Sequence, residues 1–246
     1  MSDLPQAPAT SRHRIDPRKA GIAALACWAG FALFAWAVPA GRTRQFDQLG
    51  LMFWRAHDLH PLGPPWVLEW VRDLTAMGGF LQLKLYTIMA FVALFWLRRR
   101  REAVLLALTV LSGSAVNALL KLVFGRPRPE IVPHLTEAGG ASFPSGHSFN
   151  SASTYIALAL AFAALSPRAN VRHTLIAGSI VLSLMVAWSR VWLGVHWPSD
   201  VMAGWLGGAA WTFTASALLY RPARVVLETT GDFSEPDSPQ APPPEN

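Results

Sequence analysis

Residues 103–121 read AVLLALTVLSGSAVNALLK, an apolar run without a charged residue until it ends in Lys121. A helix needs about 17–25 such residues to cross the hydrocarbon core of a bilayer. An ionisable side chain beside hydrocarbon is costly, roughly 2.5–3.5 kcal/mol at a helix centre, so the lysine is a candidate functional group. The run therefore predicts a membrane-spanning helix with a polar site at one end.

Five similar blocks occupy much of the remaining chain, at residues 20–40, 79–97, 148–165, 174–193 and 201–219. The chain has 246 residues and only 15% of them are charged, against about 25% in average globular proteins. We therefore predict an all-α integral membrane protein, a bundle of about six transmembrane helices with its active site at the outer interface. Its expected parts are a basic N-terminal tail (1–19), a transmembrane domain (20–220, with an outer segment 41–78) and a disordered proline-rich tail (221–246).

Basic residues flank these blocks instead of forming one helix face. The net charge is +6, but no basic face is interleaved with exposed aromatic residues, which argues against nucleic acid as a partner. With a cytoplasmic N-terminus, more than half of the 21 Lys and Arg residues fall in cytoplasmic segments, as the positive-inside rule requires. We predict a multi-pass protein of the cell (inner) membrane, with cytoplasmic termini and a site facing the periplasm or exterior.

Three shorter features refine this prediction. Residues 38–41 (VPAG) resemble a signal cleavage site, but the apolar stretch before them exceeds the usual core of about 7–15 residues, which favours an uncleaved first span. The single cysteine, Cys27, allows no intrachain disulfide and no cysteine-based metal site. Residues 66–77 are compatible with an amphipathic helix lying in the membrane interface.

The first of three polar clusters pairs Lys121 with Arg128-Pro129. Gly125 and Pro127 lie between them and cannot extend a helix, so the chain turns and can bring both cations to one point. By itself this pattern also fits a lysine that snorkels to the interface beside ordinary interfacial arginines. Arg126 is a further candidate for the same role.

The second cluster is Pro144-Ser145-Gly146-His147, which immediately precedes the fourth block. Ser145 can cap the helix, and Gly146 lets backbone N–H groups approach a ligand closely. A helix N-terminus is a ready site for an anion. The competing interpretation is a plain loop and cap with an interfacial histidine.

The third cluster contains Ser189-Arg190, His196 and Asp200. Pro198 suits a first helical turn, and a separation of four residues places His196 and Asp200 on one face of a helix. A carboxylate there can hold one imidazole N–H and leave the other nitrogen as a nucleophile. A helix cap with a surface ion pair would give the same pattern. Three cations, two histidines and a carboxylate together suit a phosphate.

At these residues the chain resembles the type 2 phosphatidic acid phosphatase family of membrane lipid phosphatases. The family signature is a lysine, six residues and Arg-Pro; then Pro-Ser-Gly-His; then Ser-Arg, five residues, a histidine, three residues and an aspartate. Every position is matched between Lys121 and Asp200, and the spacing selects Arg128 over Arg126. The resemblance covers roughly residues 80–220.

The resemblance implies a role for each residue. His196 would attack phosphorus to form a phosphohistidine, Asp200 would orient it, and His147 would act as acid and then as base. The phosphate oxygens would be held by Lys121, Arg128, Arg190, Ser145 and Gly146. No metal or other cofactor is expected, because three cations already face the anion and no carboxylate cluster could hold Mg²⁺.

The expected activity is hydrolysis of a membrane lipid phosphate or diphosphate. Undecaprenyl diphosphate, phosphatidylglycerophosphate and phosphatidic acid are the candidate substrates, and the sequence does not choose among them. A lipid phosphotransferase with the same intermediate and a non-catalytic lipid-binding relative are the alternatives. Vanadate-dependent haloperoxidases share a similar anion site but are soluble, and the apolar blocks argue against that class.

Overall fold

The computed structural model describes residues 16–230, and this part of the chain contains helices and no strand. The helices are α1 (Pro17–Ala37), α2 (Arg44–Met52), α3 (Pro65–Ala76), α4 (Phe80–Trp96), α5 (Arg100–Phe124), α6 (Gly146–Ala163), α7 (Ala169–Trp192) and α8 (Pro198–Thr230). Residues 1–15 and 231–246 of the expected tails lie outside the described range. α8 extends into the expected tail as far as Thr230. Residues 221–230 contain no glycine and a single proline, Pro222, so few residues there disfavour a helix.

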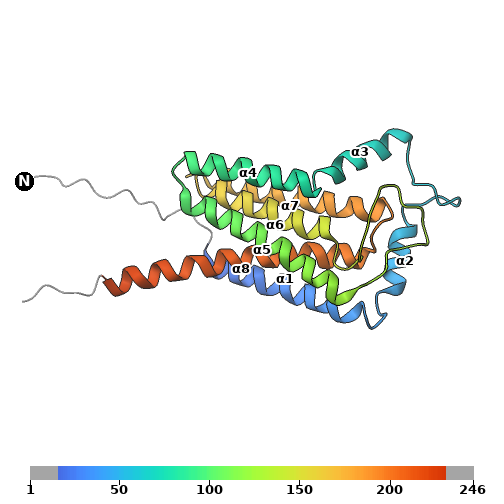
Figure 1. Cartoon of the computed structure of the whole chain (residues 1–246), viewed down its shortest axis with the longest axis horizontal. Coiled ribbons are helices and arrows are strands. Elements are labelled where there is room, and N and C mark those ends of the chain that lie inside the picture. Colours follow the sequence, from blue (N-terminus) through green and yellow to red (C-terminus); the bar gives the residue numbers. More distant parts are fainter. Residues whose placement is uncertain (1–15, 231–246) are drawn as a thin grey trace, which may run out of the picture.

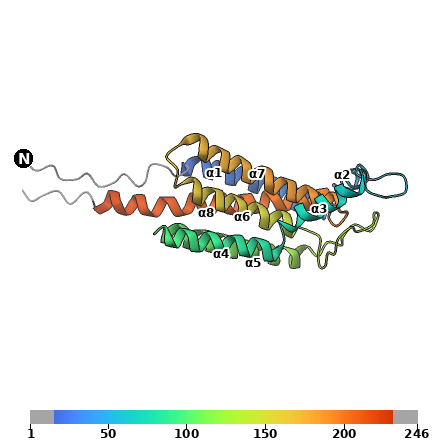
Figure 2. The same cartoon turned by 90° about the horizontal axis from the view of Figure 1, so that it is seen from above.

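α6 lies at the centre of the bundle, where it packs against α4, α5, α7 and α8 (Figure 2). Many of its buried residues are small, such as Ser151 and Ala152. Two glycines of α8 face it: a Cβ at Gly204 would lie 2.6 Å from the carbonyl oxygen of Ser145, and one at Gly208 would overlap that of Phe149. The two helices therefore meet at backbone distance, as small residues permit in membrane bundles.

Several helices are candidate membrane spans. α1, α5 and α7 are long and apolar enough, and α3 with α4 forms a further candidate that is bent by 49°. α6 and α8 do not meet the same criterion. For α6 the reason is its enclosure by four other helices, since a helix shielded from lipid does not need a continuous apolar surface. The all-helical membrane architecture is confirmed, and the count of six spans stays a prediction.

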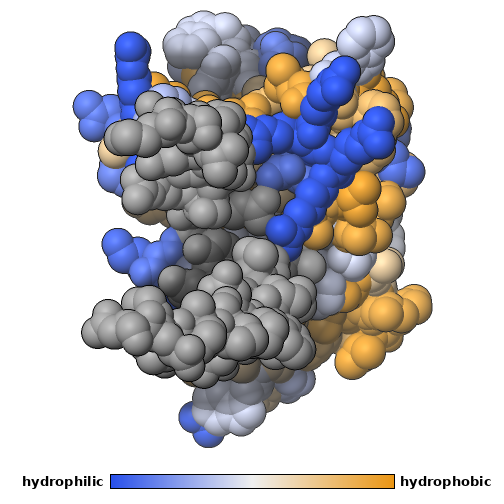
Figure 3. All heavy atoms as spheres, turned by 90° about the vertical axis from the view of Figure 1, so that its left-hand side faces the viewer, coloured by the Kyte–Doolittle hydropathy of each residue, from blue (hydrophilic) through white to orange (hydrophobic). Residues whose placement is uncertain are grey.

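The two ends of the bundle carry different groups. The start of α1, the α4–α5 turn and the α6–α7 loop lie at one end (Figure 1). Seen from this end, hydrophilic side chains lie on the face towards the viewer, and hydrophobic side chains lie mainly along its right edge (Figure 3). The basic run 98–101 belongs to this end. The last turns of α5 and α7 and the first turns of α6 and α8 lie at the opposite end. All three polar clusters therefore share the end remote from that basic run.

The segment 41–78 forms two short helices at the cluster end. α3 matches the expected amphipathic helix: Val71 and Leu74 are buried on one face, and Trp66 and Trp70 are exposed on another. Its position in a membrane interface stays a prediction. α2 was not expected, and it buries a carboxylate, Asp47, whose side chain is 1% exposed.

Candidate active site

The first cluster is held together by the turn that follows α5. The helix continues one turn past Lys121, and Gly125 then ends it in a left-handed conformation with φ 54°, which glycine adopts without strain. Lys121 Nζ donates to the carbonyl oxygen of Ala141 (2.5 Å). Arg128 lies in the loop beyond and donates from Nη1 to the carbonyl oxygen of Val195 (2.7 Å). Arg128 is thereby held beside His196 of the third cluster, and Lys121 is held by the loop at Ala141.

The second cluster forms the N-terminus of α6, as expected. Ser145 is the N-cap, and its fully buried Oγ accepts hydrogen bonds from the backbone N–H of Ser148 (3.5 Å) and from the Ser148 hydroxyl (2.9 Å). The N–H groups of the next residues have no partner within the helix, as at any helix start. A Cβ at Gly146 would lie 3.5 Å from Lys121 Cε. The helix N-terminus and the lysine thus converge on one place.

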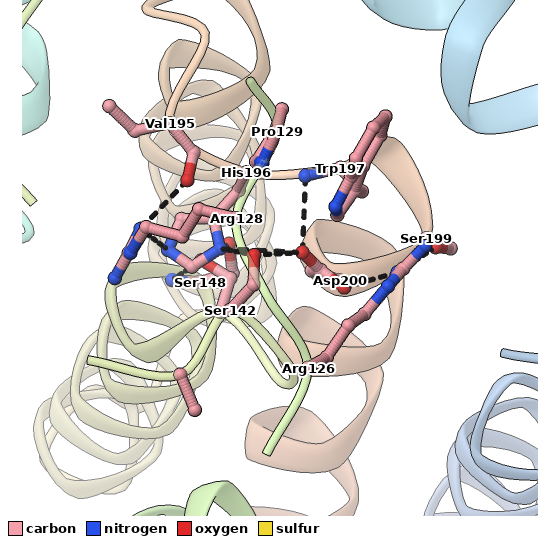
Figure 4. A network of polar contacts seen from close by, with 12 residues as sticks. Arg126, Arg128, Pro129, Ser142, Ser148, Val195, His196, Trp197, Ser199 and Asp200 are labelled. Carbon is pink, nitrogen blue, oxygen red and sulfur yellow. Dashed lines mark hydrogen bonds and ion pairs between the residues drawn. The ribbon is translucent and has the colours of Figure 1, made fainter. Parts of the chain in front are cut away.

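The third cluster differs from expectation in how Asp200 reaches His196. His196 precedes α8 and does not share a helical face with Asp200. Its Nδ1 lies 3.6 Å from Asp200 Oδ2, which is too far for a hydrogen bond. Ser142 bridges the two groups, with Oγ 3.2 Å from Nδ1 and 2.5 Å from Oδ2 (Figure 4). The carboxylate therefore acts on the imidazole through a hydroxyl.

The hydrogen-bond pattern determines which ring nitrogen of His196 carries the proton. Arg128 Nη1 lies 3.1 Å from His196 Nε2, and a guanidinium can only donate. Nε2 must therefore accept, and the proton of the neutral ring is on Nδ1. Nδ1–H then donates to Ser142 Oγ, and the Ser142 hydroxyl donates to Asp200. The Nε2 lone pair is left facing the cation cluster.

The surroundings of His196 also favour its neutral form. The side chain is buried, and burial lowers the pKa of His196 well below its ordinary value of 6.5. The charges of Arg128, Arg190 and Lys121 lower the pKa of this histidine further. A neutral imidazole is the form that can act as a nucleophile.

Arg190 and His147 complete the site from α7 and α6. Arg190 is 3% exposed and donates from Nη1 to Thr75 Oγ1 of α3 (2.9 Å). His147 lies within electrostatic range of both Arg190 and His196. A Cβ at Gly78 would lie 3.3 Å from His147 Cδ2, so the ring packs against the α3–α4 connection. Every residue expected at the site is found at this end of the bundle.

Arg126, which the family spacing did not select, makes several side-chain hydrogen bonds. Arg126 donates to Asp200 Oδ1 (2.5 Å), to Asp47 Oδ2 (2.7 Å) and to Ser199 Oγ (2.8 Å). Asp200 Oδ2 accepts in addition the backbone N–H of Trp197 (3.1 Å). Arg126 therefore contacts the carboxylates behind His196, whereas Arg128 contacts the imidazole itself. The assignment of phosphate binding to Arg128 stays a prediction.

Comparison with known proteins identifies the chain's relatives. The sequence model of the PAP2 superfamily matches residues 102–224. Phosphatidylglycerophosphatase B of Bacillus subtilis (strain 168) is 32% identical over 144 residues, which cover 57% of this chain and 69% of that protein. A putative undecaprenyl-diphosphatase of Escherichia coli (strain K12) is 28% identical over 173 residues, 66% of this chain and 78% of that protein.

The fold has a counterpart among solved structures. The crystal structure of a transmembrane PAP2 type phosphatidylglycerolphosphate phosphatase from Bacillus subtilis superposes with a TM-score of 0.73 at 24% identity. The match covers 81% of this chain and 96% of the other. Together with the family match over residues 102–224, these findings establish that the chain belongs to the PAP2 superfamily and is an enzyme of the phosphatase class.

Proposed function

We propose that the protein hydrolyses a membrane lipid phosphate or diphosphate through a phosphohistidine, without a metal ion. The observation that carries this proposal is the chain of contacts behind His196. Ser142 and Asp200 hold the Nδ1 side of the ring, and the Nε2 side faces Arg128. A neutral nucleophile is thus directed at the place where positive charge gathers.

In the first step Nε2 attacks phosphorus, so that a P–N bond forms as the bond from phosphorus to the leaving oxygen breaks. His147 supplies the proton that the leaving oxygen takes up. The ring of His196 becomes positively charged, and Asp200 stabilises that charge through Ser142. A positioned acid of this kind contributes about 10²–10⁴-fold to a rate.

In the second step water replaces the histidine. His147, now neutral, removes a proton from the water as its oxygen bonds to phosphorus, and the P–N bond breaks. His196 returns to the neutral form with its proton on Nδ1. The products depend on the substrate. A lipid monoester gives the lipid alcohol and one inorganic phosphate, whereas a lipid diphosphate gives the lipid monophosphate and one inorganic phosphate.

Lys121, Arg128 and Arg190 bind the non-bridging oxygens in both steps, together with the N-terminus of α6. Their charge does the work that Mg²⁺ does in many phosphoryl-transfer enzymes, because the transition state spreads negative charge over these oxygens. Lys121 and Arg128 donate to backbone carbonyl oxygens, and these bonds hold the side chains near the places they would occupy with phosphate.

The expected substrate is a lipid that enters from the bilayer with its head group at the cluster end. Relatives named for phosphatidylglycerophosphate and for undecaprenyl diphosphate support this class without choosing a member of it. We infer that the cluster end faces the periplasm or exterior of the cell membrane, since the opposite end carries the basic run 98–101.

Purified protein in detergent tests the proposal. Wild type should release phosphate from lipid phosphates in the presence of EDTA, and His196→Ala should abolish release. The exposed His173 provides a matched control, and His173→Ala should keep full activity. Full activity of His196→Ala, or complete loss with EDTA, would overturn the mechanism. A panel of the three candidate lipids, with and without an alcohol acceptor, would identify the substrate and separate hydrolysis from transfer.

A further inference from the structure

Asp47 is a buried carboxylate at the cluster end to which no role has been assigned. It belongs to α2, outside the signature motifs and before the residues matched to the superfamily, which begin at 102. The side chain is 1% exposed. A buried charge is costly unless it is paired and hydrogen-bonded, so the contacts of Asp47 show what it is there to hold.

The side-chain contacts of Asp47 join it to the start of α8 and to Arg126. Oδ1 accepts the backbone N–H of Ser199 (2.8 Å), and Oδ2 accepts the Ser199 hydroxyl (2.8 Å). Oδ2 also accepts Arg126 Nη2 (2.7 Å). A carboxylate at a helix N-terminus is favourable, because the first N–H groups of the helix lack partners. Asp47 supplies this cap to α8 from another helix.

The guanidinium of Arg126 therefore bridges two carboxylates. One guanidinium nitrogen, Nη2, binds Asp47, and the other, Nη1, binds Asp200. Asp200 in turn holds Ser142, and Ser142 holds His196. An unbroken series of contacts thus connects α2 with Nδ1 of His196, the ring nitrogen opposite the proposed nucleophile. Figure 4 shows the part of this series from Arg126 to His196.

We propose that Asp47 is a positioning residue for His196, acting through Arg126, Asp200 and Ser142. Its negative charge would repel a phosphate, so it does not bind the substrate. Its effect is on the carboxylate that stabilises the charged ring: when Asp47 shares the Arg126 guanidinium, Asp200 keeps more of its own charge for Ser142 and His196. This inference rests on the proposed role of His196.

Asp47→Asn tests the proposal, because it removes the charge and keeps the size of the side chain. We expect kcat to fall about 10- to 100-fold, the scale of a weakened hydrogen bond to a buried charge. KM should change less than about threefold, because Lys121, Arg128 and Arg190 are untouched. Asp73→Asn makes the same change on an exposed residue of α3 and should leave both constants at the wild-type values.

Two further measurements separate positioning from general destabilisation. In a double mutant with Ser142→Ala, the loss from Asp47→Asn should largely disappear, since both residues act on the same path and their effects are then not additive. Ser199→Ala removes the hydroxyl shared by Asp47 and Arg126 but keeps the backbone bond. Ser199→Ala should give a smaller fall in kcat than Asp47→Asn, at unchanged KM. If Asp47→Asn does not fold, Ser199→Ala takes its place in the test.

The outcomes discriminate between this inference and the proposed function. Wild-type kcat in Asp47→Asn, while His196→Ala is inactive, would overturn the role of Asp47 alone. A rise in KM with constant kcat, or fully additive losses in the double mutant, would do the same. Full activity of His196→Ala would instead overturn the function on which the inference rests.

Discussion

Replacing Ser142 by alanine removes the one hydroxyl between His196 and Asp200. The change leaves the carboxylate in place, because Asp200 keeps its bonds from Arg126 and from the Trp197 N–H. What is lost is the pair of contacts at 3.2 Å and 2.5 Å from Ser142 Oγ. Nδ1 then has the carboxylate only at 3.6 Å, beyond hydrogen-bond range.

The size of the effect follows from these distances. A hydrogen bond to a charged group contributes roughly 1.5–3 kcal/mol, and each 1.36 kcal/mol corresponds to tenfold in rate. In the proposed mechanism the ring is charged only once the P–N bond forms, so the loss falls on the transition state and not on substrate binding. We expect kcat to fall about 10- to 100-fold, with KM within about threefold of wild type.

Phosphate release at saturating lipid in detergent measures both constants. Ser179→Ala deletes a hydroxyl that bonds only within α7, to Ile176, and should behave as wild type. If Ser142→Ala keeps kcat within threefold of wild type, the bridge has no catalytic role and the reasoning about the relay is refuted. An equal loss in Ser179→Ala would point to the assay and not to the site.

Two other predictions concern stability. Gly208→Ala would force a Cβ into the carbonyl of Phe149 and should cost about 1–3 kcal/mol, seen as a lower thermal midpoint, whereas Gly178→Ala meets open space and should not. The low pKa of buried His196 means that below about pH 6.5 the unfolded chain binds a proton that the folded chain does not. Stability should therefore fall as pH drops from 7 to about 5, and His196→Gln should flatten the slope; an equal slope in that variant would contradict the assignment.

Hydropathy and motif spacing predict much of this molecule. The apolar blocks correspond to α1, α4, α5, α6, α7 and α8, and α6 was found although it is rich in serine, because its block follows a cap sequence. The candidate phosphate-binding residues Lys121, Arg128 and Arg190 were predicted because charge beside hydrocarbon is conspicuous, and their role stays a proposal. Each of these signals is local in the sequence.

The remaining contacts depend on proximity between distant segments. Asp47 and Arg126 are 79 positions apart, and no spacing rule connects them. Ser142 lies 54 positions from His196 and was hidden because serine is ordinary in a loop. α2 was overlooked because a short polar helix has no long apolar run. The sequence predicts that the chain turns at its prolines. The direction that the chain takes after each turn depends on packing between distant segments, which the sequence does not show.

The backbone contact between α6 and α8 has a consequence for how the protein meets bilayers of different thickness. The Ser145 N–H donates to the Asp200 carbonyl oxygen (3.0 Å), at the level where Gly204 lets the helices touch. A mismatched bilayer makes helices tilt, and a pair joined in this way tilts as one body. His147 on α6 and Asp200 on α8 then keep their separation while the peripheral helices adjust. Adaptation to a new lipid environment can thus take place on the outside of the bundle, without retuning the chemistry within it.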